Sequence, residues 1–277
     1  MLSIIRFRYL HRICNLKFAI SVISCTLICF LDSAKMIKFA QYLDMPLNCG
    51  ESFVYTSSNL FSITIYSLAI IFNLADINSN YNDFTFYRFR ISNIKWMICN
   101  IISSSLVVLT LMFTILLTCV IILSPYSYAG SSWSEPVYMM SFYNPNLSSS
   151  LFGLYFYAPN ILTAMDVPSA IIHSYILLFL YFNILFLVIY TGNLFLKNNI
   201  SVFLAIVFHF IGYLLNYSNS YTFNLSVLSH DILLENNLST QYDNPNRFNI
   251  MTSLILMITI ISMLALLICL NSKKCEE

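Results

Sequence analysis

The sequence predicts an all-α, polytopic membrane protein with six transmembrane helices, an amphipathic N-terminal interfacial helix and an aromatic-rich extracellular loop. Composition, long apolar runs and the placement of cations all point to this class. Hydrophobic residues make up 58% of the 277 residues and charged residues only 9%, with a mean hydropathy of +0.76. Average soluble domains are roughly half apolar and one quarter charged. The chain therefore lacks the polar surface to cover a soluble core, and we treat residues 1–277 as a single transmembrane domain.

The first 17 residues are expected to form a helix that lies in the membrane interface. Apolar residues recur at three- and four-residue spacing from Leu2 to Leu16, and Arg8 and Arg12 fall on the opposite side. Such a helix places its apolar stripe in lipid and its arginines toward headgroups. A basic flank that only orients the first span explains the same pattern equally well.

Apolar runs predict six membrane spans. A helix needs about 20 mostly apolar residues to cross the hydrocarbon core, and the first and fifth runs must borrow flanking residues to reach that length. The runs are 18–31, 54–75, 97–123, 171–191, 200–215 and 250–270. A cleaved signal peptide is the alternative for the first run, but the following "LDSAKM" offers no clear cleavage site.

The cations predict the orientation of these spans. Lys and Arg accumulate on the cytoplasmic side of a membrane protein. With the N-terminus inside, ten of the 13 cations fall in inner segments, and only Lys35, Lys38 and Arg247 fall outside. We therefore expect a multi-pass protein of the plasma (cytoplasmic) membrane with both termini in the cytoplasm.

Residues 76–96 form the second inner segment and contain an unusual cluster, "YRFRISNIKW". Topology explains the cations Arg88, Arg90 and Lys95, but not the aromatic residues Phe89 and Trp96 beside them. We expect a short elbow at the membrane face, whose arginines bind headgroups or the carboxylates of a partner. An interfacial anchor without a partner is the alternative.

The second outer loop, residues 124–170, is expected to fold as a cap on the outer leaflet. It is 47 residues long, holds no Lys or Arg, and is dense in Tyr, Phe and Trp. Tyr and Trp favour the membrane–water boundary. Trp133, Glu135 and Asp166 are its candidate functional residues. The third outer loop, about 216–249, is expected to be solvated, with a short helix at "VLSHDILLE".

Motifs for catalysis and for cofactors are missing from the sequence. There is no P-loop, no H-E-x-x-H and no G-x-S-x-G, and no Asp or Glu lies inside the six runs. We expect no catalytic, cofactor or metal site in this chain, and the net charge of +1 gives no reason to expect nucleic-acid binding. The missing carboxylates count against proton-coupled transport.

Hydroxyl groups and histidines inside the spans are the candidate substrate path. These residues are Ser104, Thr110, Thr114, His173 and His209. Small hydroxyl residues in spans serve helix packing first. Each histidine is most simply a neutral side chain bonded to a nearby carbonyl or hydroxyl.

The order of these parts resembles the six-span permease subunits of ATP-binding-cassette (ABC) exporters of low-GC Gram-positive bacteria, including those for antimicrobial-peptide immunity and export. The resemblance lies in the basic N-terminal helix, the "R-x-R-I-S-N-I-K-W" elbow, and a fourth and fifth span joined by a short basic turn. The long outer loop before the fourth span departs from that pattern.

The resemblance implies a transporter subunit rather than an enzyme. Two ABC ATPase subunits would supply ATP and Mg²⁺ chemistry, and a second permease subunit would complete the path. The elbow residues Arg88, Phe89, Arg90, Lys95 and Trp96 would dock on the ATPase, with Arg8 and Arg12 in support. The substrate would be amphipathic, a peptide or a lipid-like drug, and an acidic cap would tolerate a cationic peptide.

Two other classes of protein remain open from the residues alone. A secondary carrier or channel would work without nucleotide and depend on an ion gradient. A non-transporting scaffold or membrane enzyme would show neither flux nor a stable ATPase partner. An adjacent gene with a P-loop would favour the exporter.

Overall fold

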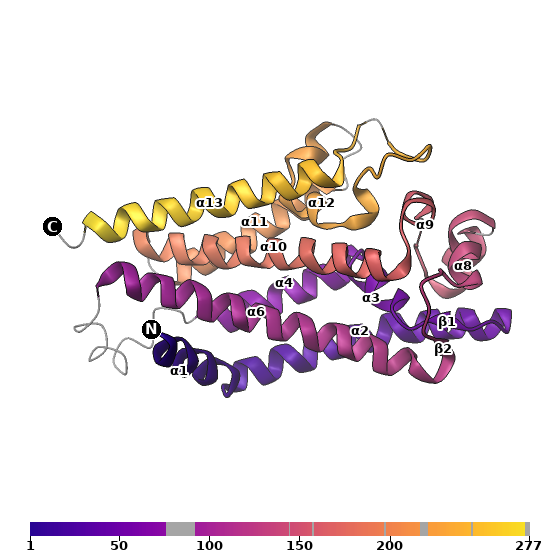
Figure 1. The fold of residues 1–277 in the computed structure, drawn as a ribbon, viewed down its shortest axis with the longest axis horizontal. Helices are drawn as coiled ribbons and strands as arrows, with labels where there is room; N and C mark the ends of the chain where they lie inside the picture. Colours follow the sequence, from indigo (N-terminus) through magenta and orange to yellow (C-terminus); the bar gives the residue numbers. More distant parts are fainter. Residues whose placement is uncertain are drawn as a thin grey trace.

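The computed structural model describes residues 1–75, 92–143, 145–156, 158–196, 198–216, 221–244 and 246–274, and these are mostly helical. Long helices run along the longest axis of the molecule, and both chain termini lie at one end, the termini end (Figure 1). Short helices and a small sheet gather at the opposite end, the cap end (Figure 1).

Among the described residues, five helices are long and apolar enough to cross a membrane, in agreement with a membrane-embedded protein. They are α2 (Leu16–Leu43), α6 (Asn93–Leu123), α10 (Val167–Phe195), α11 (Asn198–Asn216) and α13 (Ile250–Lys274). The run predicted as the second span is divided between α3 (Glu51–Thr56) and α4 (Leu60–Leu74). A single long helix over residues 54–75 is therefore a wrong prediction.

Helix α2 continues well past the predicted end of the first span at Leu31. Its N-terminus is capped by Asn15, whose side chain accepts a hydrogen bond from the Lys17 amide, and it ends where Asp44 takes a left-handed conformation, φ 55°. Asp32, expected at the start of an outer loop, lies inside this helix and is buried.

The N-terminal helix α1 (Leu2–Ile13) packs against α6. Arg8 is only 5% exposed, whereas Leu2 is 84% exposed. The expected orientation, with Arg8 and Arg12 toward headgroups, is therefore wrong. Aromatic and hydroxyl partners on α6 draw both arginines into the bundle.

Helix α10 occupies the centre of the bundle and α13 its periphery. The most apolar stretch of α10 is 56% buried, against 17% for α13. Tyr181 and Phe186 of α10 are fully buried. Gly192 lets α11 approach closely, because a Cβ there would lie 2.6 Å from Cβ of Ser201.

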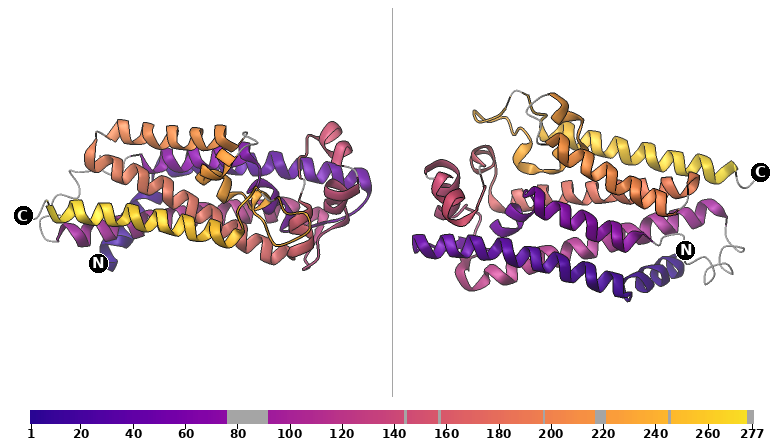
Figure 2. Two further views of the ribbon diagram at one scale, coloured as in Figure 1. Left: turned by 90° about the horizontal axis from the view of Figure 1, so that it is seen from above. Right: turned by 180° about the vertical axis from the view of Figure 1, so that it is seen from behind.

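The expected cap is folded. It contains η1 (Ser124–Tyr126), β2 (Ser127–Tyr128), α7 (Glu135–Tyr138), the π-helical η2 (Met139–Tyr143), α8 (Pro145–Phe152) and α9 (Pro159–Ala164). Strand β2 pairs in parallel with β1 (Leu47–Asn48), with Leu47 opposite Ser127. This pairing joins the cap to the loop after α2, and α8 lies beside the end of α2 in both views of Figure 2.

The third outer loop is also folded, so the expectation that it is solvated is wrong. It forms η3 (Tyr221–Leu225), α12 (Val227–Asp231) and η4 (Leu233–Glu235), which confirms the short helix expected at "VLSHDILLE". Leu228, Ile232 and Leu233 are buried, and α12 packs against α10, α11 and α13. Apolar burial outweighed the Asn- and Ser-rich composition of the segment.

Candidate functional site

A cavity of about 1020 Å³ lies toward the cap end of the bundle. Its walls come from four parts of the chain: α2, the break between α3 and α4, the cap segment 140–156, and the α11–α12 region with η4. Sites for drug-sized ligands measure about 300–1,000 Å³. The cavity is therefore large enough for a small amphipathic molecule or a peptide segment.

The break between α3 and α4 faces the cavity and coincides with the local sequence "SSN", residues 57–59. The hydroxyls of Ser57 and Ser58 both donate to the Val54 carbonyl, at 3.0 and 2.8 Å. The Asn59 side chain then accepts from the Phe61 amide at 3.1 Å and caps α4. Such local bonds compete with helix continuation, so Ser58 and Asn59 are left lining the cavity.

One charged pair lies at the α2 wall. Asp32 is 3% exposed, and its carboxylate accepts from the Ser62 hydroxyl at 2.5 Å and from the Asn59 amide at 3.5 Å. Lys35 Nζ lies 3.7 Å from the other carboxylate oxygen and lines the cavity. A buried carboxylate needs such partners, and here they come from the α4 N-terminus and from one turn further along α2.

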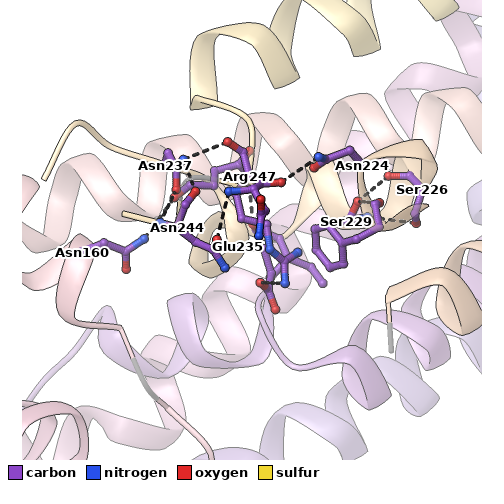
Figure 3. Close-up of polar contacts among 12 residues, drawn as sticks. Asn160, Asn224, Ser226, Ser229, Glu235, Asn237, Asn244 and Arg247 are labelled. Atoms are coloured by element: carbon purple, nitrogen blue, oxygen red, sulfur yellow. Dashed lines mark hydrogen bonds and ion pairs between the residues drawn. The ribbon is translucent and has the colours of Figure 1, made fainter. Parts of the chain in front are cut away.

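A second charged pair lies at the wall formed by the third outer loop (Figure 3). Glu235 lines the cavity and pairs with Arg247, with 3.0 Å between the charged atoms. The Arg247 guanidinium also lies over the Phe223 ring. Burial raises the pKa of Glu235, and the charge of Arg247 opposes that rise. Asn237 ties the same loop together by donating to the carbonyls of Asn244 and Arg247.

The cavity thus offers one cation, one anion, several neutral donors and acceptors, and aromatic rings. Tyr55 and Phe156 meet edge to face, with ring centroids 5.8 Å apart, and both line it. A mixed lining of this kind suits an amphipathic ligand, whose apolar part packs on rings while polar groups meet Lys35 or Glu235. In the part of the chain that the structure describes, no three His, Cys, Asp or Glu side chains come together as a metal site.

A third charged region, at the termini end, holds the predicted arginines of α1. The Arg8 guanidinium carbon lies 4.3 Å from the centroid of the Trp96 ring. Arg12 donates to the hydroxyls of Ser104 and, at 3.4 Å, Ser103. Burial lowers the pKa of Arg8 to about 10 and of Arg12 to about 9, so both stay charged at neutral pH. Both arginines therefore hold α1 onto the first turns of α6.

The predicted elbow is seen only in part. Lys95 is exposed and Trp96 is half-buried at the start of α6, where Trp96 meets Arg8. Arg88, Phe89 and Arg90 lie outside the described residues.

The predicted substrate-path residues do not converge on one site. The hydroxyls of Thr110 and Thr114 donate to carbonyls of their own helix, while the Ser104 hydroxyl accepts a hydrogen bond from Arg12. His173 bonds the Ser169 carbonyl at 2.8 Å, and His209 bonds the Tyr181 hydroxyl at 2.7 Å. Both histidines have the nearby carbonyl or hydroxyl partner that the simpler interpretation expects.

The predicted cap residues do not line the cavity. Trp133 is buried and donates to the Met165 carbonyl at 2.7 Å, which ties the two ends of the cap together. Glu135 is exposed in the first turn of α7, and Asp166 is exposed as the N-cap of α10. Each of these acids lies at a helix N-terminus, where a negative charge is favourable. The anionic group that lines the cavity is Glu235.

Sequence reasoning missed the residues that give the cavity its charge. The predicted first span ends at residue 31 and leaves Asp32 and Lys35 outside it, and Glu235 falls in the loop that was expected to be solvated. The "SSN" triplet inside an apolar run was the available signal, because hydroxyl residues followed by Asn are typical of a helix start. No local pattern signals that Glu235 faces a cavity.

No family model matches the chain, and no curated protein or solved structure matches it either.

Proposed function

We propose that this chain is the permease subunit of an ABC exporter that moves or clears an amphipathic substrate, a peptide or a lipid-like drug. The observation that carries the proposal is the cavity of about 1020 Å³ beside a membrane-embedded bundle, with aromatic rings, one cation and one anion in its walls. Such a lining serves a molecule with both apolar and charged parts.

The sixth crossing in this proposal is α4. It is 15 residues long, and a helix of that length spans about 22 Å at 1.5 Å per residue, less than the roughly 30 Å hydrocarbon core. Its N-terminus opens on the cavity at Asn59 and Leu60, so a water-filled cavity would shorten the distance to be crossed. Six crossings would put both termini on the same side of the membrane, and the distribution of Lys and Arg in the sequence favours the cytoplasm for them.

Energy would enter through the elbow at residues 76–96, which joins α4 to α6. Arg8 on Trp96 and Arg12 on Ser104 fasten α1 to the start of α6. A partner that moves the elbow would then move α1 and α6 together, and α6 contacts both α2 and α10. These contacts support the elbow as a coupling element for an ATPase that supplies ATP and Mg²⁺ chemistry in trans.

Co-purification of an ATPase from native membranes tests this proposal. The tagged chain should bring down an ATPase, and a triple Arg88→Ala, Arg90→Ala, Trp96→Ala variant should lose it. A matched double variant, Lys273→Ala with Lys274→Ala, removes cations from the end of α13 and should keep it. No ATPase with the folded wild-type chain, or equal recovery with the triple variant, would contradict the proposal.

An ion-coupled carrier is the second candidate, and Asp32 favours it. A carboxylate buried in a membrane-crossing helix beside the interrupted α3–α4 is a feature of ion-coupled transporters, whereas the apolar runs of the sequence contain no carboxylate. In vesicles containing the chain alone, a proton gradient should then drive uptake of an amphipathic dye, and Asp32→Asn should abolish it. Transport that needs ATP and a partner, and ignores the gradient, would exclude the carrier.

A further inference from the structure

We propose that Asp231 is a proton-binding site, and that the proton it holds keeps α12 and η4 seated against the bundle. The Asp231 carboxyl group takes no part in the proposed substrate contacts, and its role does not depend on the energy source of the proposed function.

Asp231 is a buried acid without a counter-charge. It is the last residue of α12 and only 1% exposed. In the part of the chain that the structure describes, neither of its carboxylate oxygens has a hydrogen-bond partner. An isolated ionised carboxylate in such a place is strongly unfavourable, and the group holds its proton instead. Burial accordingly raises the pKa of Asp231 well above its usual range.

The position of Asp231 is fixed by contacts of the same short segment. The Ser226 side chain accepts from the Ser229 amide at 3.2 Å and donates to the Gly212 carbonyl of α11 at 3.0 Å. Gly212 lets the two helices touch, because a Cβ there would meet Leu228 Cβ at 3.1 Å. Helix α12 cannot move without breaking these contacts, so Asp231 is held inside the bundle.

The ionisable groups around Asp231 are neutral or already engaged. On α10, Tyr181 is close enough to interact with it electrostatically, and its hydroxyl meets Nδ1 of His209 on α11. His230 of α12 bonds the Ser253 hydroxyl through Nδ1 and the Asn224 carbonyl through Nε2, at 2.8 and 2.9 Å. Glu235 of η4 is paired with Arg247.

Among the described residues, α10, α11, η3 and η4 contribute no Lys or Arg beside Asp231. Tyr213 of α11 lines the cavity, and α13 has no ionisable side chain between Ile250 and Leu264. A sodium ion would need several oxygen ligands, and among the described residues no three His, Cys, Asp or Glu side chains come together as a cation site. A proton is therefore the occupant that this environment favours.

Loss of this proton has a consequence for the cavity. An ionised Asp231 would gain hydration by leaving the bundle, and α12 would be pulled out with it. Ile232, Leu234 and Glu235, directly after Asp231, form one wall of the cavity. Proton release from Asp231 is thereby coupled to movement of that wall.

Infrared spectroscopy of the full-length chain in lipid nanodiscs tests the bound proton. The wild type at pH 7 should show a carbonyl band of a protonated carboxylic acid that is missing from Asp231→Asn. Glu235→Gln, the matched control four residues away, should keep the band. An unchanged band in Asp231→Asn would overturn the proposal, and so would a change that follows sodium concentration instead of pH.

Hydrogen exchange tests the seating of the segment and guards against a variant that fails to fold. With intrinsic rates corrected for pH, amides 227–235 of the wild type should lose protection between pH 6 and pH 10, while those of α10 keep theirs. Asp231→Asn, which cannot ionise, should stay protected throughout, and Glu235→Gln should behave like the wild type. Equal protection of the wild type at both pH values would refute the coupling.

Discussion

Raising the pH should loosen the contact between α3 and the cap, because it removes a proton from Glu51. This side chain is fully buried at the start of α3. Its carboxyl group accepts from the Asn48 amide at 2.9 Å, from the Ser134 amide at 2.6 Å and from the Ser134 hydroxyl at 2.7 Å. It thereby joins the loop after α2 to the cap.

The size of the effect follows from the pKa of Glu51. Burial raises this pKa from its ordinary value of 4.5 to about 7, against the opposing effect of the three hydrogen bonds. Since one pKa unit corresponds to about 1.4 kcal/mol, the difference corresponds to about 3 kcal/mol. The folded state binds the proton more tightly than the unfolded state, so this contribution is complete below about pH 4.5 and is lost as the pH rises through about 7.

Trp133 provides a local assay, because it lies next to Ser134 in the cap. In a Trp96→Phe background it is the sole tryptophan, and thermal unfolding followed by its fluorescence should show Tm falling by roughly 5–10 °C from pH 4.5 to pH 8. Glu51→Gln should flatten this dependence. Glu135→Gln, an exposed acid two residues from the probe, should leave it unchanged. A Tm that rises with pH, or the full wild-type slope in Glu51→Gln, would contradict this role of Glu51.

Packing at Gly192, docking of α1 onto α6, and stability of the cap can each be tested by a single substitution. Gly192→Ala should lower the free energy of unfolding by about 1–3 kcal/mol, because its Cβ would lie 2.6 Å from Cβ and 3.2 Å from Cα of Ser201; thermal unfolding that matches the wild type would contradict this. Arg8→Ala should weaken α1 docking by about 1–2 kcal/mol through loss of the contact with Trp96, seen as faster exchange of amides 2–13, whereas Arg6→Ala on the exposed side should have no such effect. Trp133→Phe should destabilise the cap by about 1–3 kcal/mol, because the Met165 carbonyl loses its donor; limited proteolysis of the cap should show it, and unchanged cleavage rates would argue against it.

Composition and apolar runs were sufficient to predict a membrane-embedded helical bundle, because they reflect the solvent in which the chain folds. Four of the runs correspond closely to α6, α10, α11 and α13. The first run ended too early at Leu31, because Asp32 looked like a loop residue. Its carboxylate is stabilised by Ser62 and Asn59, partners 27 and more residues away that no local pattern identifies.

The orientation of α1 shows the same limit. A helix with an apolar stripe and a basic face predicts an interfacial helix, but the basic face here packs inward on Trp96, Ser103 and Ser104. The choice between lipid headgroups and partners on α6 depends on tertiary structure. The third outer loop was misread for a related reason, because its polar residues bond one another, as Asn237 does with Asn244 and Arg247, while Leu228 and Ile232 are buried.

The sequence did not predict where in the fold the candidate site lies. Hydroxyl residues are rare in apolar runs, so those on α6 were predicted to line a substrate path. The hydroxyls of Thr110 and Thr114 instead donate to carbonyls of α6 itself. The cavity is instead built from Lys35, Asn59, Tyr155 and Glu235, which four separate segments contribute. Convergence of that kind follows from the packing of the cap and α12, which the sequence does not reveal residue by residue.

The most direct test of the proposed permease is substrate-stimulated ATP hydrolysis by the complex that we propose it forms with an ATPase, isolated from native membranes. An amphipathic peptide of Leu and Lys should raise hydrolysis, and Lys35→Gln should lower the peptide concentration needed, because it removes a like charge from the cavity. Lys38 lies three residues further along α2 and does not line the cavity. Lys38→Gln should therefore match the wild type. No stimulation by the peptide, or the same response from both lysine variants, would contradict a permease that holds its substrate in this cavity.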